Sequence, residues 1–170
     1  VDAARRAGAD SADAYLSAFD ESEVTVRKGA TDRVVEAGSH GMGLRVFVGG
    51  RTAVCSTTDL RPEAIEALAR DAVELARISE PDEFAGLPDP AEFFRGRGDA
   101  LQLFDEAVEG LSTEAMIEMA VACEDAAFST DARITNSDGA SVSKRAGEVV
   151  LVNSAGFAGA YPATSVSLMV

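Results

Sequence analysis

The sequence predicts an α+β domain in which antiparallel β-hairpins or sheets pack with two main α-helices. Apolar and polar residues alternate in several short segments, and Val24 and Val26 with their polar neighbours are typical of a half-buried strand. Gly49-Gly50 and Asp138-Gly139 each lie between two such segments, and these pairs favour the tight turns of β-hairpins. No segment shows the strand–helix–strand alternation of a parallel sheet, so we expect the strands to pair antiparallel.

The first third of the chain is expected to hold a short helix and then four or five strands. The helix is DAARRAGA, and the strand candidates are ADAYLSAF, EVTVRKG, RVVEAGS, GLRVFV and RTAVCST. With a two-residue turn at Gly49-Gly50, Leu44 would face Cys55 and Val46 would face Ala53. This register predicts that Cys55 lies on the core side of the sheet.

Two longer helices are predicted, at about residues 62–79 and 113–128. Pro62 suits the first position of one helix, and Ser112 or Thr113 suits the N-cap of the other. Apolar residues recur at helical spacing in both segments, which predicts one buried face on each helix. These faces consist of Ile65, Leu68, Ala72 and Leu75 in the first helix and of Met116, Ala120, Cys123 and Ala127 in the second.

A long segment, residues 80–104, separates the two helical regions. It holds three of the five prolines and four of the eight phenylalanines: Phe84, Phe93, Phe94 and Phe104. A loop of this length is uncommon inside a compact domain, and is either functional or a segment that wraps the body. The phenylalanines indicate that it is held against the protein. We expect it to divide the domain into two halves, 1–80 and 105–170.

The composition disfavours several classes of function. The chain has 29 acidic and 15 basic residues, a net charge of −14, so direct binding to a nucleic-acid backbone is not expected. Its two cysteines show no disulfide framework, which is typical of a reducing compartment. No apolar run is long enough to span a bilayer, and no signal peptide is recognisable. We therefore expect a cytoplasmic protein, and both ends of the sequence suggest a piece of a longer one.

No intrinsic catalytic site is predicted. His40 is the single histidine and lies in GSHGMG, which is expected to be a glycine-rich turn. A catalytic zinc needs three protein ligands, and no paired-histidine motif is present. A serine triad would also depend on His40, and the serine elbow motif GxSxG is absent. The glycines precede a strand rather than a helix, which disfavours a phosphate site. An EF-hand would need a distal glutamate that is missing.

Four stretches are characteristic, in this order along the chain: GMGLRVFVGGRTAVCSTTDL, ARISEPDEFAGLP, RITNSDGASVS and VVLVNSAGFAGAYPATSVSLMV. They resemble the N-terminal region of TldD/PmbA-family proteins. Together they cover nearly all of the sequence. The short motifs STTDL and RITNSDG favour the PmbA branch, which is the TldE-type branch of the family.

The resemblance implies a function that the composition does not show. Members of the family resemble subunits of a TldD–TldE peptidase that degrades unfolded peptides, and were first described as modulators of DNA gyrase. The motif HExxxH, which binds zinc, belongs to the TldD-type subunit, while the TldE-type subunit lacks the metal ligands. We therefore expect no catalytic or metal residue and no cofactor in this chain, with zinc in a partner subunit.

Two function classes follow from the resemblance. The first is the N-terminal domain of a metallopeptidase complex, on the non-catalytic TldE-type subunit, forming the subunit interface and a chamber for unfolded peptides. Its partner would be a TldD-type metal-bearing subunit or another copy of the chain. The alternative is a regulatory binding module that modulates DNA gyrase without proteolysis. An independent hydrolase conflicts with the lone histidine.

The predicted hairpin at Asp138-Gly139 offers the candidate contact residues. A two-residue turn would place Asn136 opposite Ser141, Ile134 opposite Ser143, and Arg133 opposite Lys144. Neither face of such a hairpin can bury much apolar area, so it suits contact with a partner subunit or a peptide. The contact candidates are Arg133, Asn136, Ser141 and Ser143. A solvated hairpin without a partner is the alternative.

Overall fold

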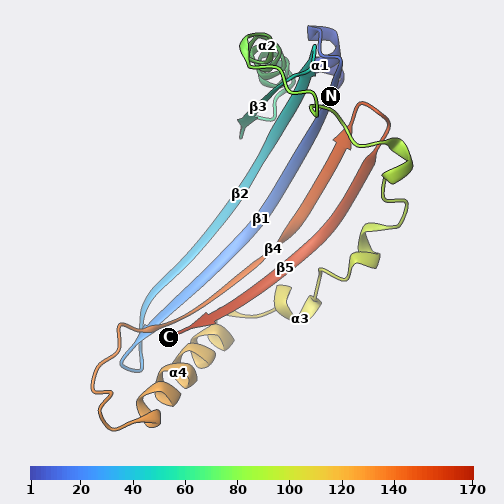
Figure 1. Cartoon of the computed structure of the whole chain (residues 1–170). Coiled ribbons are helices and arrows are strands. Elements are labelled where there is room, and N and C mark those ends of the chain that lie inside the picture. The colour runs from blue at the N-terminus through green and yellow to red at the C-terminus, as the bar shows by residue number, and fades with distance from the viewer. The chain divides into compact units, whose positions relative to one another are not determined.

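The computed structural model describes all residues, 1–170, and confirms the α+β class (Figure 1). Five strands form one antiparallel sheet in the order β3-β2-β1-β4-β5. The strands are β1 (Ser11–Arg27), β2 (Ala30–Val48), β3 (Arg51–Thr57), β4 (Ala140–Asn153) and β5 (Ala158–Met169). The helices are α1 (Asp2–Ala7), α2 (Pro62–Ile78), α3 (Glu106–Glu109) and α4 (Thr113–Thr130), with 3-10 turns η1 (Pro90–Glu92) and η2 (Gly98–Leu101). No helix is both long and apolar enough to cross a membrane.

The chain forms two compact units, each assembled from three separate segments. Unit 1 comprises Val1–Ala18, His40–Leu101 and Glu148–Tyr161. Unit 2 comprises Phe19–Ser39, Gln102–Gly147 and Pro162–Val170. Strands β1, β2, β4 and β5 contribute residues to both units because they are long.

In unit 1, α1 and α2 cover one face of the sheet. The β2–β3 register has Leu44 opposite Cys55 and Val46 opposite Ala53, which confirms the sequence-based prediction. The turn residues Gly49 and Gly50 have φ values of 55° and 71°, a conformation that glycine adopts at little cost. The core of the unit combines small helix residues with larger strand residues, including Ala4, Ala12, Ala14, Leu44, Val46, Ala69, Ala72, Val73 and Ala76.

Helix α2 confirms its predicted span but turns a slightly different face to the core. Pro62 is its first residue, as expected. Ala72 is fully buried, whereas Leu75 is 44% exposed, so the predicted place of Leu75 in the buried face is wrong. Small residues, Ala69, Ala72, Val73 and Ala76, take the contact because they let the helix backbone approach the sheet closely.

In unit 2, α4 packs against β1 and β4. Met116 and Ala120 of α4 lie with Val24, Val26 and Val142 in a second core. The Ser112 hydroxyl accepts a hydrogen bond from the backbone N–H of Ala115 at 3.2 Å, which identifies Ser112 as the N-cap. The predicted helix face is correct for Met116 and Ala120, and Cys123 is half-buried beside it.

Two predicted turns are extended strand in the structure. Residues 11–27 and 30–48 each form one continuous strand where two short strands were expected. His40 and its glycines therefore lie in β2, and the predicted glycine-rich turn is wrong. A Cβ at Gly38 would lie 3.2 Å from the Asp20 carboxylate of β1, so glycine permits a close approach of this side chain to β2.

The two edges of the sheet differ in protection. At the β5 edge in unit 2, Thr164 donates its backbone N–H to the Leu103 carbonyl at 2.9 Å, and Pro162 lacks an N–H. At the other edge, β3 pairs only with Met42–Val48 of β2. Residues 30–40 of β2 are exposed and have no strand on that side, which leaves an open backbone edge in unit 2.

Candidate functional site

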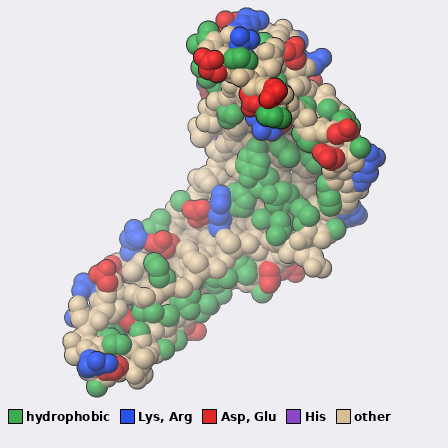
Figure 2. All heavy atoms as spheres, in the orientation of Figure 1, with side chains coloured by type: hydrophobic (Ala, Val, Ile, Leu, Met, Phe, Trp, Pro, Cys, Tyr) green, Lys and Arg blue, Asp and Glu red, His purple; other side chains and the backbone are tan.

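Unit 1 leaves one face of its sheet without a helix. Ala12 and Ala14 of β1 point to α1 and α2, so the alternate residues Asp13 and Tyr15 lie on the opposite face. Val54 of β3 lies on this open face as well, between two residues that contact the helix-covered core. Hydrophobic side chains gather on this face in Figure 2.

An open-face groove of about 450 Å³ runs over these residues. Its floor is apolar yet accessible: Val54 is 61% exposed, Tyr15 47% and Leu151 39%. Apolar side chains that are exposed side by side make this groove a candidate surface for contact with another molecule. The lining residues are Asp13, Tyr15, Gly43, Arg45, Val54, Pro88, Glu92, Phe93, Leu151, Asn153 and Phe157.

The long segment 80–104 forms one wall of the groove. Phe93 packs edge-on against Phe157, with ring centroids 5.5 Å apart and an interplanar angle of 65°. Phe84 is 87% exposed and Phe94 is 51% exposed, so two of the four phenylalanines hold the segment less firmly than predicted. This aromatic contact and the hydrogen bond from the Asp82 N–H to the Gly50 carbonyl, at 2.7 Å, hold the wall against the sheet.

An ion pair crosses the groove floor. Arg45 donates from Nε to both Asp13 carboxylate oxygens, at 3.1 and 3.2 Å, and from Nη2 to Oδ2. The hydrogen bonds that Arg45 donates to Asp13 raise the pKa of Arg45, so the guanidinium stays charged. Arg45 also lies over the Phe47 ring, 5.2 Å from its centroid. These contacts fix both charged groups on the sheet and neutralise them mutually.

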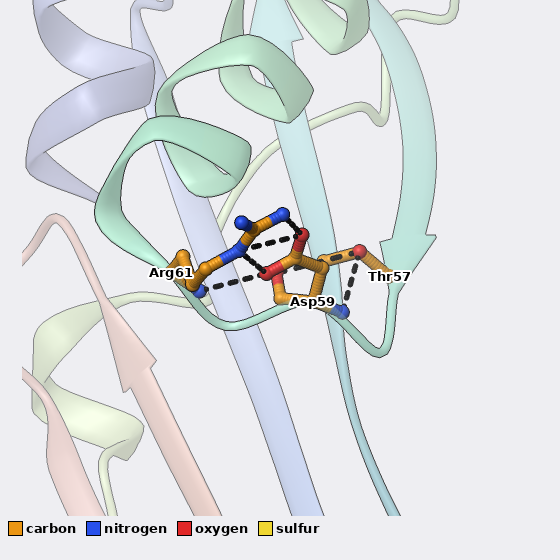
Figure 3. A network of polar contacts seen from close by, with 3 residues as sticks. All are labelled: Thr57, Asp59 and Arg61. Atoms are coloured by element: carbon orange, nitrogen blue, oxygen red, sulfur yellow. Dashed lines mark hydrogen bonds and ion pairs between the residues drawn. The ribbon is translucent and has the colours of Figure 1, made fainter.

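A polar network joins β3 to α2 in the same unit (Figure 3). Asp59 accepts hydrogen bonds from the Arg61 backbone N–H at 3.1 Å and from Arg61 Nε at 2.9 Å. These bonds lower the pKa of Asp59 to about 2. The Asp59 backbone N–H donates to the Thr57 hydroxyl at 3.0 Å. Since every partner lies within this short connection, the network serves to orient the start of α2.

The hairpin predicted at Asp138-Gly139 does not form, so its cross-strand pairings of residues 133–137 are wrong. Residues 131–139 are irregular, and β4 begins at Ala140. The neighbours of β4 are β1 and β5, which leaves no position for a strand at 133–137. Arg133 instead pairs with Asp131, with Nη2 and Oδ2 2.8 Å apart, and Asn136 is exposed.

Of the four predicted contact residues, two lie on β4. Ser141 and Ser143 are half-buried, and the Ser143 hydroxyl lies 2.8 Å from that of Ser167. Ser143 also lines a polar cavity of about 360 Å³ in unit 2. Four of the five charged residues that line this cavity form the ion pairs Glu23–Arg33 and Glu21–Arg145, and the fifth, Lys144, donates to the backbone carbonyls of Glu109 and Leu111. The structure therefore does not bring Arg133, Asn136, Ser141 and Ser143 together as one site.

The groove residues were not singled out from the sequence, although a signal was present. In β3, Ala53, Val54 and Cys55 are apolar in succession, which indicates a strand with both faces in contact with apolar groups. The same holds for VVLV in β4, which contributes Leu151. The pairing of Asp13 with Arg45 depends on a contact between β1 and β2 that alternation alone does not specify.

The chain offers no group of three or more His, Cys, Asp or Glu side chains positioned to hold a metal ion. His40 is exposed on β2. A catalytic zinc ion therefore does not fit the residues of this chain.

Two family models match the sequence. The model described as PmbA/TldA metallopeptidase domain 1 matches residues 12–76, and that of the PmbA/TldA metallopeptidase central domain matches residues 106–170. Metalloprotease PmbA of Escherichia coli O157:H7 is 33% identical over 94% of this chain and 35% of its own length. A Metalloprotease PmbA homolog of Haemophilus influenzae is 30% identical over 99% of this chain and 36% of its own length. The chain thus spans about a third of these relatives.

Solved structures share the fold. A proposed modulator of DNA gyrase from Bacteroides thetaiotaomicron has a TM-score of 0.85 and 28% identity, covering 98% of this chain and 38% of its own. TldE from Thermococcus kodakarensis has a TM-score of 0.71 and 15% identity, covering 97% and 36%, and at that identity shows the fold alone. The two family models and the PmbA relatives agree, and the chain belongs to the PmbA/TldD metallopeptidase family.

Proposed function

We propose that this chain is the N-terminal domain of a cytoplasmic metallopeptidase assembly, on the TldE-type subunit that carries no metal ligands. Family membership and the PmbA relatives support the assembly. The zinc would then belong to a TldD-type partner subunit, because this chain lacks a ligand set for it. The contribution of this domain is to bind peptide and to form part of the subunit interface.

The open-face groove is the observation on which the peptide-binding role rests. Tyr15, Val54 and Leu151 expose apolar surface on a rigid sheet, where side chains of a folded protein would normally be covered. An unfolded peptide exposes apolar side chains that a folded one buries. A groove with an apolar floor therefore favours unfolded chains and supports the delivery of such chains to a peptidase.

The open edge of β2 supports the interface role. Residues 30–40 present backbone N–H and C=O groups that no strand of this chain satisfies. Strand addition from a partner subunit would satisfy them through main-chain hydrogen bonds. Val34 and Val35, which are 45% and 38% exposed on this edge, would gain apolar cover in the same step.

Two matched substitutions in the full-length protein separate these roles. Val54→Lys places a charge on the groove floor, and Val34→Lys places the same charge on the open edge, each at an exposed valine. We expect Val54→Lys to weaken peptide binding and cleavage while the partner subunit still co-purifies. We expect Val34→Lys to reduce co-purification of the partner, or self-association if the partner is a second copy. Unchanged peptide binding in Val54→Lys would contradict the role of the groove.

A regulatory module is the alternative function. The specific observation in its favour is the fold and 28% identity shared with the Bacteroides protein described as a proposed modulator of DNA gyrase. The net charge of −14 favours contact with the enzyme over contact with its DNA. Capture of gyrase without a TldD-type subunit, from cells that contain both, would favour this alternative. Capture of the TldD-type subunit favours the peptidase assembly.

A further inference from the structure

The open-face groove carries an uncompensated negative charge. Three charged side chains line it, namely Asp13, Arg45 and Glu92. Arg45 is held by Asp13 in a two-pronged ion pair, so these two charges cancel on the groove floor. Glu92 is exposed on η1 and takes part in no ion pair. Its carboxylate is therefore the free charge of the site.

The wall that contains Glu92 strengthens this charge. Residues 80–92 hold no lysine or arginine and five acidic residues, all exposed: Glu80, Asp82, Glu83, Asp89 and Glu92. None of the five forms an ion pair. Asp82 and Asp89 accept hydrogen bonds only from the backbone, from Phe84 and Ala91. Acidic groups along a groove raise the local concentration of cations, including cationic side chains.

Arg51 and Arg95 lie next to residues 80–92 but do not neutralise their carboxylates. Arg51 donates to the Ser79 carbonyl at 3.0 Å, and Arg95 donates to the Pro90 carbonyl at 3.5 Å. Neither guanidinium contacts a carboxylate. Arg97 is paired with Asp99. The charge of the wall thus remains negative even when Arg51 and Arg95 are counted against its five carboxylates.

We propose that the open-face groove selects unfolded peptide segments in which an apolar residue and a lysine or arginine lie within two positions of each other. The apolar side chain rests on Tyr15, Val54 and Leu151, and the cation lies beside Glu92. In an extended peptide, side chains two positions apart point to the same side, so the two can reach the floor and the wall of one groove. The Phe93 and Phe157 rings beside Glu92 add faces that attract a cation. This inference rests on the proposed peptide-binding function and adds a substrate class to it.

Fluorescence anisotropy with the full-length protein tests the charge preference. The probes are labelled decapeptides of equal length that carry a leucine and, two positions later, lysine, glutamate or glutamine in a Gly-Ser background. We expect the Leu-Lys peptide to bind about tenfold more tightly than the Leu-Glu peptide at low salt, with Leu-Gln between them. The preference should shrink as the Debye length falls from about 10 Å at 0.1 M salt to about 3 Å at 1 M.

Charge variants assign the preference to the wall of the groove. We expect Glu92→Gln to reduce the preference for Leu-Lys and Glu92→Lys to invert it. Glu118→Lys is the matched control, because Glu118 is exposed on α4 in unit 2 and lies outside the groove. It should leave the preference unchanged. Equal effects of Glu92→Lys and Glu118→Lys would overturn the proposal, because the preference would then depend on the net charge of the chain and not on the groove.

A neutral variant distinguishes failure of this inference from failure of the proposed function. Val54→Asn removes apolar floor without adding charge and should weaken all leucine peptides alike. If Val54→Asn weakens binding but the three peptides bind equally to the parent protein, the groove binds peptide and the charge preference is refuted. If Val54→Asn leaves every affinity unchanged, the groove does not bind peptide and both proposals fail. Circular dichroism checks that each variant is folded.

Discussion

Glu124 on α4 is fully buried, and its Oε2 accepts a hydrogen bond from the backbone N–H of Gly29 at 2.9 Å. Gly29 and Lys28 form the turn between β1 and β2, with φ values of 73° and 54°. Hydrogen bonds from the backbone of Lys28 and Gly29 lower the pKa of Glu124. A charged side chain of the helix thus holds a hairpin whose turn contains a lysine at positive φ.

Removal of the Glu124 carboxylate should destabilise unit 2. Glu124→Ala removes the partner of the Gly29 N–H and leaves a cavity where the buried Glu124 side chain packs, so we expect a lower Tm. Glu124→Gln keeps one acceptor oxygen and should lower Tm less. Thermal unfolding followed by circular dichroism measures both. Exposed Glu118 on α4 supplies the control Glu118→Ala, which should leave Tm almost unchanged.

Gly139 should be intolerant of a side chain. Its φ is 120°, and a Cβ there would lie 2.8 Å from the Val26 carbonyl oxygen. We expect Gly139→Ala to reduce the free energy of unfolding by about 1–3 kcal/mol, because a non-glycine residue is strained at this φ. Gly156, with φ 96° and no atom near its Cβ position, is the control that carries backbone strain without the clash. Chemical denaturation of the two variants compares them, and equal losses would show that the contact with Val26 is unimportant.

The Asp13–Arg45 pair should contribute modestly to stability. Its side chains are 15% and 44% exposed, so solvent screens part of the attraction. We expect a double-mutant cycle with Asp13→Asn and Arg45→Gln to give a coupling of about 1 kcal/mol, at the upper end for accessible pairs. Arg45→Lys should lose most of it because an ammonium cannot make the two-pronged contact. A coupling that persists in the lysine variant would contradict this geometry.

Asp59 should make stability depend on pH in the acidic range. Its pKa is lowered from 3.8 to about 2 by hydrogen bonds from Arg61. A carboxyl with a lower pKa in the folded state stabilises the fold above its unfolded pKa, and this contribution is lost as the pH falls through the folded value. We expect Asp59→Asn to remove this dependence between about pH 4 and pH 2, with a small effect because the pair is accessible. Urea unfolding of parent and variant across that range measures the difference.

The two cysteines should react slowly with thiol reagents in the folded protein. Cys55 and Cys123 are half-buried, each beside one of the two cores. Partial burial limits access of the reagent to each sulfur atom. Labelling followed by mass spectrometry should show slower modification of both than after denaturation. Rapid labelling of either thiol in the native state would show local opening around it.

The fold was predictable where a local pattern determined it. Gly49-Gly50 specified both the turn and the Leu44–Cys55 register, and Pro62 marked the first residue of α2. The Asp138-Gly139 pair carried the same kind of signal, yet no hairpin forms there because β4 pairs with β1 and β5. A turn signal describes only the local chain, and tertiary pairing decides which strands become neighbours.

The groove and the buried glutamate were less accessible to sequence reasoning. Tyr15, Val54 and Leu151 come from three strands, so their proximity depends on strand order. Glu124 lies one position beyond the predicted apolar face of α4 and reads as an ordinary surface acid. Its burial follows from the turn at Lys28-Gly29, which lies far away in sequence and supplies the N–H groups that a buried carboxylate requires.

The discontinuous composition of each unit has a consequence for biosynthesis. In unit 1, Ala12 and Ser154 exchange hydrogen bonds of 3.0 and 2.8 Å, although 142 positions separate them. Such contacts close large loops and form slowly. Strand β1 therefore leaves the ribosome long before its neighbour β4 is translated. During this time the apolar residues of β1 that pack near β4 stay exposed to solvent. The nascent chain would depend on chaperones during this interval, and both units acquire their complete sheet only once β5 has emerged.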